Sequence, residues 1–328
     1  MIRADISNVW CSVSLPELLR NERKLFDTHM TLAGGEYRRD GLYDWLRLSG
    51  ASRRAWLAEP TEAAAAIRDR SEILVVVGAD PTIAGARAAI RLLYGRRVTM
   101  PRLIFAGDSF SSDDWLDVAA ALEGHDFSVL VCGQTGCEAA PLTILRALYR
   151  ILEKRYGDKL HEHVFAAAPE TKNPMRSLAK AENFRLIARP TDPIGVRSAL
   201  SPVGFLIMAA AGMNPDLLFD GAADSFRLCD ARNLDNPAWL CAAASIALAD
   251  KGVRDQVFCV PTPAAEELGR WWARTASAWS REGRGVCGTS LRLTADLASV
   301  GDWLLDGGNG HCATVLRLPP DRRRASVE

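Results

Sequence analysis

The sequence predicts an α/β protein: a parallel five-stranded sheet with flanking helices, followed by a shorter second α/β unit. The first observation is that short apolar runs alternate with stretches whose apolar residues recur at helical spacing. The second is that the run at 71–78 ends in Gly78, and the run at 127–132 leads into a glycine-containing loop. Strands alternating with helices form parallel sheets, which bind ligands beyond the carboxyl ends of their strands. We therefore look for chemistry in the loops after these two runs.

The first half of the chain supplies five expected strands. A helix from the glycine loop to residue 156 ends at Gly157, which suits a helix C-cap. Residues 190–195 form an expected loop. The expected strands are 71–78, 102–106, 127–132, 163–167 and 184–188, with helices at 83–94 and 173–183 among them.

The first 60 residues are less periodic. We expect helices at 16–29, around 43–46 and at 51–57, which together wrap the sheet that follows. A separate helix at 61–70, with Thr61 as its N-cap, enters the first strand.

The second half supplies two clear strands, at 256–260 and 313–318, and so predicts a shortened subdomain. We expect an almost wholly apolar, buried helix at 202–211, a short helix at 215–219, and a long helix with Asn236 as N-cap and Pro237 at its first position. Helices at 264–278 and 294–305 follow, with a glycine loop near 283–288 between them. The expected division is an N-terminal segment (1–60), a first subdomain (61–200), linking helices (201–235), a second subdomain (236–318) and a flexible tail (319–328).

Composition excludes several classes of function. The 40 basic and 40 acidic residues balance, so nothing favours nucleic acid, which requires a concentrated positive surface. No apolar run approaches the roughly 18 residues of a membrane span. The eight cysteines form no CxxC pair, which predicts reduced thiols in a cytoplasmic protein, no metal site and no cofactor.

A resemblance to a known family rests on several segments in order, from about residue 43 to 318. They are 75–78 with 85–89, 127–131 through 153–157, 200–204 with 211–212 and 221–222, the tryptophan pair 271–272, and 294–301. Together they resemble the glucose-6-phosphate isomerase family, whose fold has two sugar-isomerase-type (SIS) α/β subdomains. The family continues for roughly a further quarter of its length and supplies a late catalytic lysine there, so the resemblance implies a C-terminally short member.

The resemblance implies a ligand site at two loops. The family's phosphate loop corresponds to Gly133, Thr135, Gly136, Cys137 and Glu138, of which Thr135 and Gly136 suit the task. A carboxylate at Glu138 would repel a phosphate from the helix N-terminus, or it is simply a first-turn acid of that helix.

The turn after the first strand holds Asp80, Pro81 and Thr82 where the family has two glycines and a serine. Thr82 keeps the serine's role if the turn binds ligand, whereas Asp80 and Pro81 also suit an N-cap and a first helical position.

The family's proton-transfer groups are replaced. Its glutamate base falls at Ser277 or Ala278, with Glu282 as a displaced substitute; its histidine falls at Ala298. Its arginine falls at Val196, with Arg197 next to it. Two further candidates come from the residues alone: Cys137 as a nucleophile at a helix N-terminus, and His311 as an acid/base in a glycine-rich loop.

These features predict a divergent family member that binds a small sugar- or polyol-like molecule between its subdomains and does not carry out standard glucose-6-phosphate isomerisation. A repurposed enzyme is the preferred interpretation, and a catalytically inactive sugar-phosphate-binding or scaffolding protein is the alternative. The tryptophans at 239, 271, 272, 279 and 303 are expected in the core and at the interface of a homodimer.

Overall fold

The computed structural model of the chain describes residues 2–34, 53–78, 80–95, 97, 100–133, 138–169, 171–188, 199–278, 286–306 and 310–319. Three expected segments lie outside these ranges: the helix around residues 43–46, the loop at 190–195 and the tail beyond residue 319. Within the described ranges, no helix combines the length and apolar character that crossing a membrane requires.

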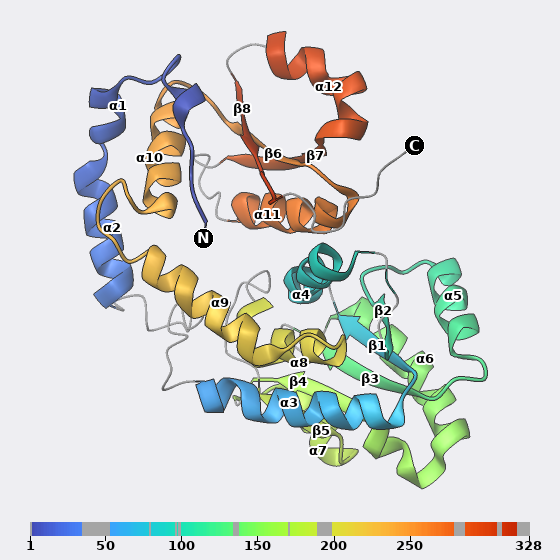
Figure 1. The fold of residues 1–328 in the computed structure, drawn as a ribbon. Helices are drawn as coiled ribbons and strands as arrows, with labels where there is room; N and C mark the ends of the chain where they lie inside the picture. Colours follow the sequence, from blue (N-terminus) through green and yellow to red (C-terminus); the bar gives the residue numbers. More distant parts are fainter. Residues whose placement is uncertain are drawn as a thin grey trace.

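A parallel five-stranded sheet forms the centre of the first half, as predicted (Figure 1). Its strand order is β2-β1-β3-β4-β5. β1 and β3 are buried along their whole length because helices cover both faces. The strands are β1 (Ile73–Gly78), β2 (Arg102–Ala106), β3 (Phe127–Cys132), β4 (Val164–Ala168) and β5 (Arg185–Ala188).

The alternation of side chains along β1 divides the core into two layers. Leu74 and Val76 belong to the cluster that α3 (Arg53–Arg70), α4 (Asp80–Tyr94) and α8 (Pro202–Ala210) complete on one face. Val75 and Val77 belong to the cluster completed by α5 (Ser112–Leu122), α6 (Ala139–Tyr156) and α7 (Pro174–Ala181) on the other. The sheet is therefore doubly wound.

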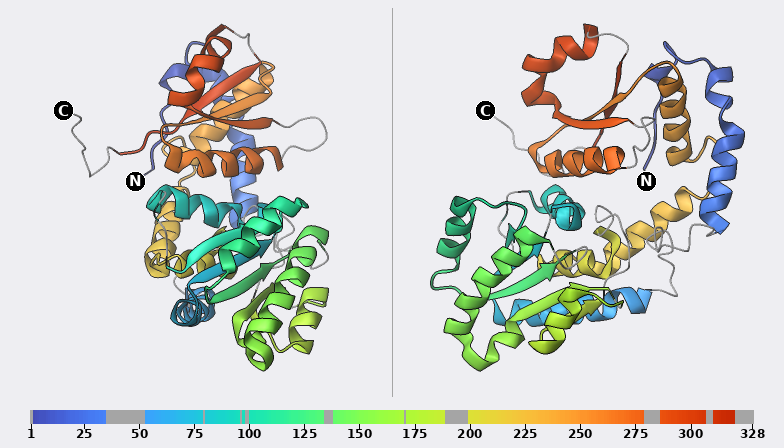
Figure 2. Two further views of the ribbon diagram at one scale, coloured as in Figure 1. Left: turned by 90° about the vertical axis from the view of Figure 1, so that its right-hand side faces the viewer. Right: turned by 180° about the vertical axis from the view of Figure 1, so that it is seen from behind.

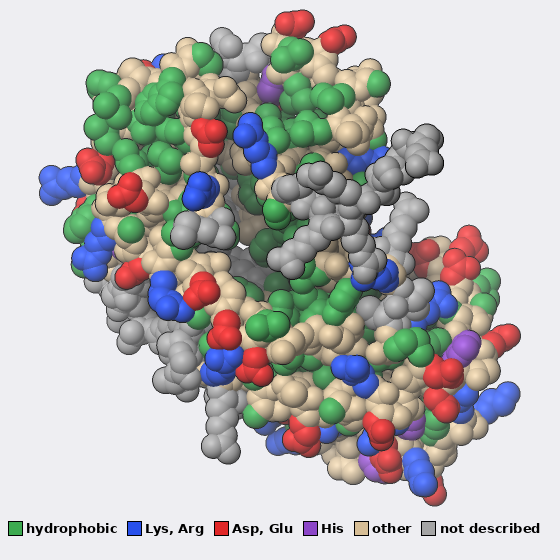
Figure 3. All heavy atoms as spheres, viewed as in Figure 1, with side chains coloured by type: hydrophobic (Ala, Val, Ile, Leu, Met, Phe, Trp, Pro, Cys, Tyr) green, Lys and Arg blue, Asp and Glu red, His purple; other side chains and the backbone are tan. Residues whose placement is uncertain are grey.

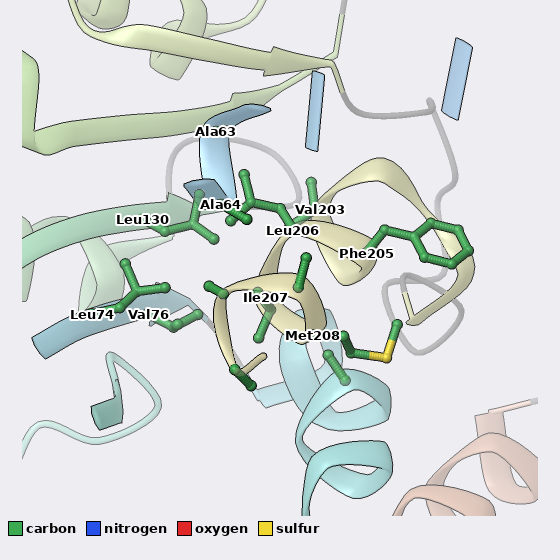
Figure 4. Close-up of a cluster of buried hydrophobic side chains, with 14 of the residues drawn as sticks. Ala63, Ala64, Leu74, Val76, Leu130, Val203, Phe205, Leu206, Ile207 and Met208 are labelled. Atoms are coloured by element: carbon green, nitrogen blue, oxygen red, sulfur yellow. The ribbon is translucent and has the colours of Figure 1, made fainter. Parts of the chain in front are cut away.

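The predicted apolar helix α8 is buried at every residue from Pro202 to Ala210. Figure 4 shows its side chains beside Leu74 and Leu130 of the sheet and near the alanines of α3. Ser201 caps the helix by accepting a hydrogen bond from the Gly204 N–H. Contact with α8 also explains one incorrect expectation: α3 continues through a buried Pro60, so Thr61 is not its N-cap.

A second parallel sheet has the order β7-β6-β8. It contains β6 (Asp255–Val260), β7 (Cys287–Arg292) and β8 (His311–Val315), with α11 (Glu266–Ala278) and α12 (Leu293–Asp306) between them in the chain. The expectation of two strands was wrong because a third strand, β7, begins at the end of the predicted glycine loop. Gly288 belongs to this strand because α11 packs so closely that a Cβ there would lie 2.4 Å from the Ala273 carbonyl oxygen.

The linking helices and α10 follow the N-cap signals of the sequence. Asn236 accepts hydrogen bonds from two backbone N–H groups and Pro237 is the first residue of α10 (Pro237–Asp250), as predicted. α9 (Pro215–Leu228) is longer than the expected helix at 215–219.

Residues 2–34 pack against the second half of the chain and not around the first sheet, whereas residues 53–60 belong to α3, which covers that sheet as expected of the N-terminal segment. α1 (Leu15–Leu19) and α2 (Glu22–Gly34) replace the single helix expected at 16–29, and both lie along α10 in Figures 1 and 2. Val13 and Leu18 share an apolar cluster with Ala243 and Ala247 of α10. α10 is apolar round most of its circumference and so needs cover on several sides, but local sequence patterns cannot identify which segment provides it.

Candidate functional site

The first sheet has a topological switch point between β1 and β3. The chain leaves β1 toward β2 on one side and leaves β3 toward β4 on the other. In sheets of this kind, such a reversal generally opens a crevice at the carboxyl ends of the strands, where ligands bind. The last paired residues are Gly78 and Cys132. A Cβ on Gly78 would lie 2.6 Å from the Cys132 carbonyl oxygen, so only glycine allows the strands to end this close together.

A second glycine, not identified from the sequence, completes this edge. Gly107 follows β2 and has a φ of +95°, a conformation that favours glycine. A Cβ there would lie 3.2 Å from both the Gly78 nitrogen and the Pro141 Cα, so the loop after β2 lies against the end of β1 and the start of α6. The signal in the sequence was a glycine at the end of each of the first three strands: Gly78 is the last residue of β1, and Gly107 and Gly133 directly follow β2 and β3.

Two helices begin beside this crevice, and both have features that oppose anion binding. α4 begins at Asp80, two residues after Gly78, and α6 has Glu138 as its N-cap residue. Pro81 and Pro141 lie in the respective first turns, and proline has no N–H to offer a ligand. A carboxylate this close to a helix N-terminus disfavours a second anion there by charge repulsion, although the Glu138 side chain itself makes no capping hydrogen bond. Glu138 thus precedes the first turn, one position earlier than the first-turn acid considered above.

The structure describes only part of the predicted site. Gly133 is buried directly after β3, Glu138 is half-buried at the start of α6, and Thr82 is the third residue of α4. These three residues lie at the end of β3 and at the starts of α4 and α6, the segments that flank the switch point. Thr135, Gly136, Cys137, Arg197 and Glu282 lie outside the described residues, so their roles remain predictions.

His311 has a different environment from the free loop position expected. It is the first residue of β8, its ring stacks on Trp303 with centroids 4.3 Å apart, and Nε2 lies 3.1 Å from the Leu304 carbonyl oxygen. These contacts tie it to α12. The amino end of β8 is the edge of the sheet opposite to the one where such sheets bind ligands.

The tryptophan pair joins the two halves of the molecule. Trp272 stacks on Phe258 of β6 with centroids 4.7 Å apart. Trp271 faces α4, where a Cβ on Gly85 would lie 3.1 Å from its indole Nε1 and 2.4 Å from the Ala199 Cβ. Figure 3 shows a hollow between the part of the molecule that contains α9 and the part that contains α11.

A shallow cavity of about 600 Å³ lies at the opposite, amino edge of the first sheet. Two of its acidic groups have basic partners: Glu72 lies 3.2 Å from His125, and Asp126 lies 3.3 Å from Arg155. Nearby, His163 stacks on Tyr156 and its Nδ1 lies 3.0 Å from the Phe127 carbonyl oxygen, while burial lowers the pKa of its imidazole. These charges pair with one another and do not converge on a ligand position, so we favour the switch point.

Comparisons with known proteins point to one family, although no protein-family model matches the chain. Glucose-6-phosphate isomerase of Heliobacterium modesticaldum is 30% identical over 294 residues, which cover 86% of this chain and 66% of that protein. Glucose-6-phosphate isomerase of Clostridium perfringens (strain SM101) is 28% identical over 336 residues, covering 99% of this chain and 74% of that protein. The chain thus spans between 66% and 74% of the length of these two relatives.

Two solved structures share the fold. A hypothetical protein of Thermus thermophilus, TT0462, superposes with a TM-score of 0.78 at 20% identity, covering 93% of this chain and 75% of that one. A glucose-6-phosphate isomerase of Chlamydia trachomatis superposes with a TM-score of 0.63 at 16% identity, covering 75% of this chain and 50% of that one. At these identities the likeness concerns the fold.

Proposed function

Because the chain belongs to the glucose-6-phosphate isomerase family, we propose that it binds a small, uncharged sugar- or polyol-like molecule at the switch point between β1 and β3. In this proposal the protein is an enzyme repurposed from the family's reaction, and it does not interconvert glucose 6-phosphate and fructose 6-phosphate. Thr82, Gly133, Thr135, Gly136, Cys137 and Glu138 contact the ligand.

The observation that carries this proposal is the chemistry of the two helix starts. A phosphate dianion is held by several free N–H groups and a positive helix end. Here each helix start combines an acidic residue, Asp80 or Glu138, with a proline in the first turn. A carboxylate accepts hydrogen bonds from hydroxyl groups without charge repulsion, so a polyol is the better partner.

The fate of the family's base position also supports a changed reaction. Isomerisation moves a proton between adjacent carbons, which requires a group of suitable pKa within hydrogen-bond reach. Of the two corresponding positions, Ala278 has no titratable group, and the Ser277 Oγ accepts a hydrogen bond of 2.9 Å from the Gly288 N–H and so ties α11 to β7. Glu282 and Arg197 are the replacement candidates in this proposal, with His311 as a weaker one because of its place at the amino end of β8.

A ligand screen with a turnover assay tests the proposal. We expect D-fructose or sorbitol to raise the melting temperature more than fructose 6-phosphate does, and a coupled assay to detect no turnover of fructose 6-phosphate. Glu138→Gln should shift the preference toward the phosphorylated sugar, whereas Glu123→Gln, at the exposed end of α5, should not. Turnover of fructose 6-phosphate, or a preference of the wild type for it, would refute the proposal.

The alternative, an inactive sugar-phosphate-binding or scaffolding protein, predicts the opposite pattern. Fructose 6-phosphate would then stabilise the wild type more than the uncharged sugars do, and turnover would be absent for all of them. Because both helix starts disfavour a dianion, the repurposed enzyme remains our preference.

The proposal also includes a homodimer in the cytoplasm. α12 contains no buried residue, and Leu297, Trp303 and Leu305 on it are exposed by 49%, 45% and 84%. An apolar helix surface of this kind commonly packs against a partner. Light scattering after size-exclusion chromatography should give twice the chain mass, and Leu305→Asp should reduce it to one. Cell fractionation tests the compartment.

A further inference from the structure

α4 of the first half and α11 of the second half pack against each other. They lie side by side in Figures 1 and 2. Gly85 of α4 allows this contact, since its missing side chain leaves room for Trp271 and Ala199. α4 also opens the switch-point crevice, so the position of α11 relative to α4 determines how the second half meets the site.

A partly buried ion pair crosses this contact. The Arg87 Nε and Nη2 atoms lie 3.2 Å and 3.1 Å from the Glu267 Oε2 atom, and the two side chains are only 18% and 22% exposed. The guanidinium also lies 5.8 Å from the centre of the Phe105 ring on β2, and the second Glu267 oxygen lies 3.4 Å from Arg270 of the same helix. The pair therefore connects the first sheet to α11 through charged groups largely removed from water, where Coulombic attraction is stronger.

α11 is fixed just as closely to its own sheet. A Cβ on Gly269 would lie 2.1 Å from the Ser290 Oγ, and the Ser277 Oγ bonds to the Gly288 N–H. Such interlocked packing resists sliding. A displacement of α11 at Glu267 is thus a displacement of β7 and of the unit around it.

The spacing along α11 shows why the pair matters at the site. Trp271, in contact with Gly85, lies four residues after Glu267 and seven residues before the helix end at Ala278. At a rise of 1.5 Å per residue, these separations are about 6 Å and about 10 Å. If α11 pivots at Trp271, a shift of about 1 Å at Glu267 moves Ala278 by nearly 2 Å. Ala278 precedes the chain segment that contains the candidate base Glu282.

We propose that Arg87 and Glu267 are positioning residues that hold the second half of the molecule in register with the switch-point site. The proposal rests on the proposed function for its ligand, but the geometry it concerns is independent of that ligand. Displacements of about 1 Å in a site can cost about 100-fold in activity, because the groups that contact the ligand are misplaced. The same misplacement should weaken ligand binding, so loss of the pair should raise the dissociation constant.

A double-mutant cycle provides the first test. Arg87→Met and Glu267→Gln keep the size of each side chain and remove its charge. We expect each single variant to raise the dissociation constant of D-fructose or sorbitol about tenfold or more. The dissociation constant of the double variant should exceed that of the weaker-binding single variant by no more than about twofold, because the two residues act as a unit. Arg227→Gln removes an exposed ion pair with Asp224 on α9, 77% and 69% exposed, and should leave affinity unchanged.

Small-angle scattering of the ligand-free variants provides the second, independent test. Both single variants should broaden the distribution of interatomic distances relative to wild type and Arg227→Gln, because the two halves lose their fixed register. If the wild type binds neither sugar, the proposed function is wrong. The scattering of the ligand-free variants still tests whether Arg87 and Glu267 hold the two halves in register. Unchanged scattering profiles, or affinity losses that simply add in the double variant, would overturn the inference.

Discussion

Replacing Gly78 with alanine tests the geometry of the switch point directly. The added methyl would lie 2.6 Å from the Cys132 carbonyl oxygen and 3.3 Å from the Cys132 Cβ. For an ordinary contact of about 3.5 Å, the ends of β1 and β3 would have to separate by about 0.9 Å. Both strands are buried and hydrogen-bonded in register up to this pair, so little relaxation is available. Overpacking of this kind costs about 1–3 kcal/mol, and we expect the upper half of that range.

Guanidinium denaturation followed by circular dichroism measures this cost. A loss of about 2–3 kcal/mol corresponds to a roughly 30- to 150-fold shift in the unfolding equilibrium. The matched control is Gly221→Ala in α9, where a Cβ would meet nothing within 4 Å and alanine should stabilise the helix by up to about 1 kcal/mol. Gly78→Ala should also weaken sugar binding, since it widens the crevice. Stability within about 0.5 kcal/mol of wild type, a change typical of surface substitutions, would refute the close approach of the two strands.

Three further predictions concern the core and the pH dependence of stability. Phe205→Ala should cost about 3–5 kcal/mol in denaturant unfolding, because the fully buried Phe205 ring on α8 packs against Phe219 of α9, and unchanged stability would contradict that burial. Burial lowers the pKa of His163 below its usual 6.5, so the unfolded chain binds the proton more readily and stability should fall as pH drops through 6.5. His163→Gln should reduce the change in melting temperature between pH 8 and pH 5. If the melting temperature of the variant changed as much as that of the wild type, His163 would not be the source of the pH dependence. Hydrogen bonds from the Ser14 backbone and from Lys251 lower the pKa of Glu17 to about 2, so its contribution is present above pH 4.5 and lost as pH falls toward 2. The protection factors of the α1 amides, which correct for the intrinsic pH dependence of hydrogen exchange, should fall over that range in the wild type, and in Glu17→Gln they should already be lower at pH 6.

The main elements of the first sheet could be read from the sequence because their signals are local. The run from Ile73 to Gly78 is apolar at every position since both faces of β1 are covered, and α8 is apolar all round for the same reason. Asn236 and Pro237 mark the start of α10 by chemistry within one turn. The family resemblance likewise rested on short segments in order, and the comparisons confirm it.

Expectations failed where a distant segment changed a local preference. Gly288 indicated a loop, but the close approach of α11 made it a strand residue. Thr61 indicated a helix start, but packing on α8 keeps α3 continuous through this position. His311 looked like a free acid/base in a loop, and its stacking on Trp303 depends on how β8 and α12 fold together.

The sequence by itself determined the parallel α/β architecture, the family, and the residue types at the two helix starts beside the crevice. These follow from periodicity, cap chemistry and charge, which act within a few residues. Only the tertiary structure decided that Gly78, Gly107 and Pro141 meet at one edge, that the N-terminal helices cover α10, and that Arg87 and Glu267, 180 positions apart in the chain, form a pair. The physical reason is that strand order and helix packing bring these groups together through long-range contacts, which no local pattern of residues encodes.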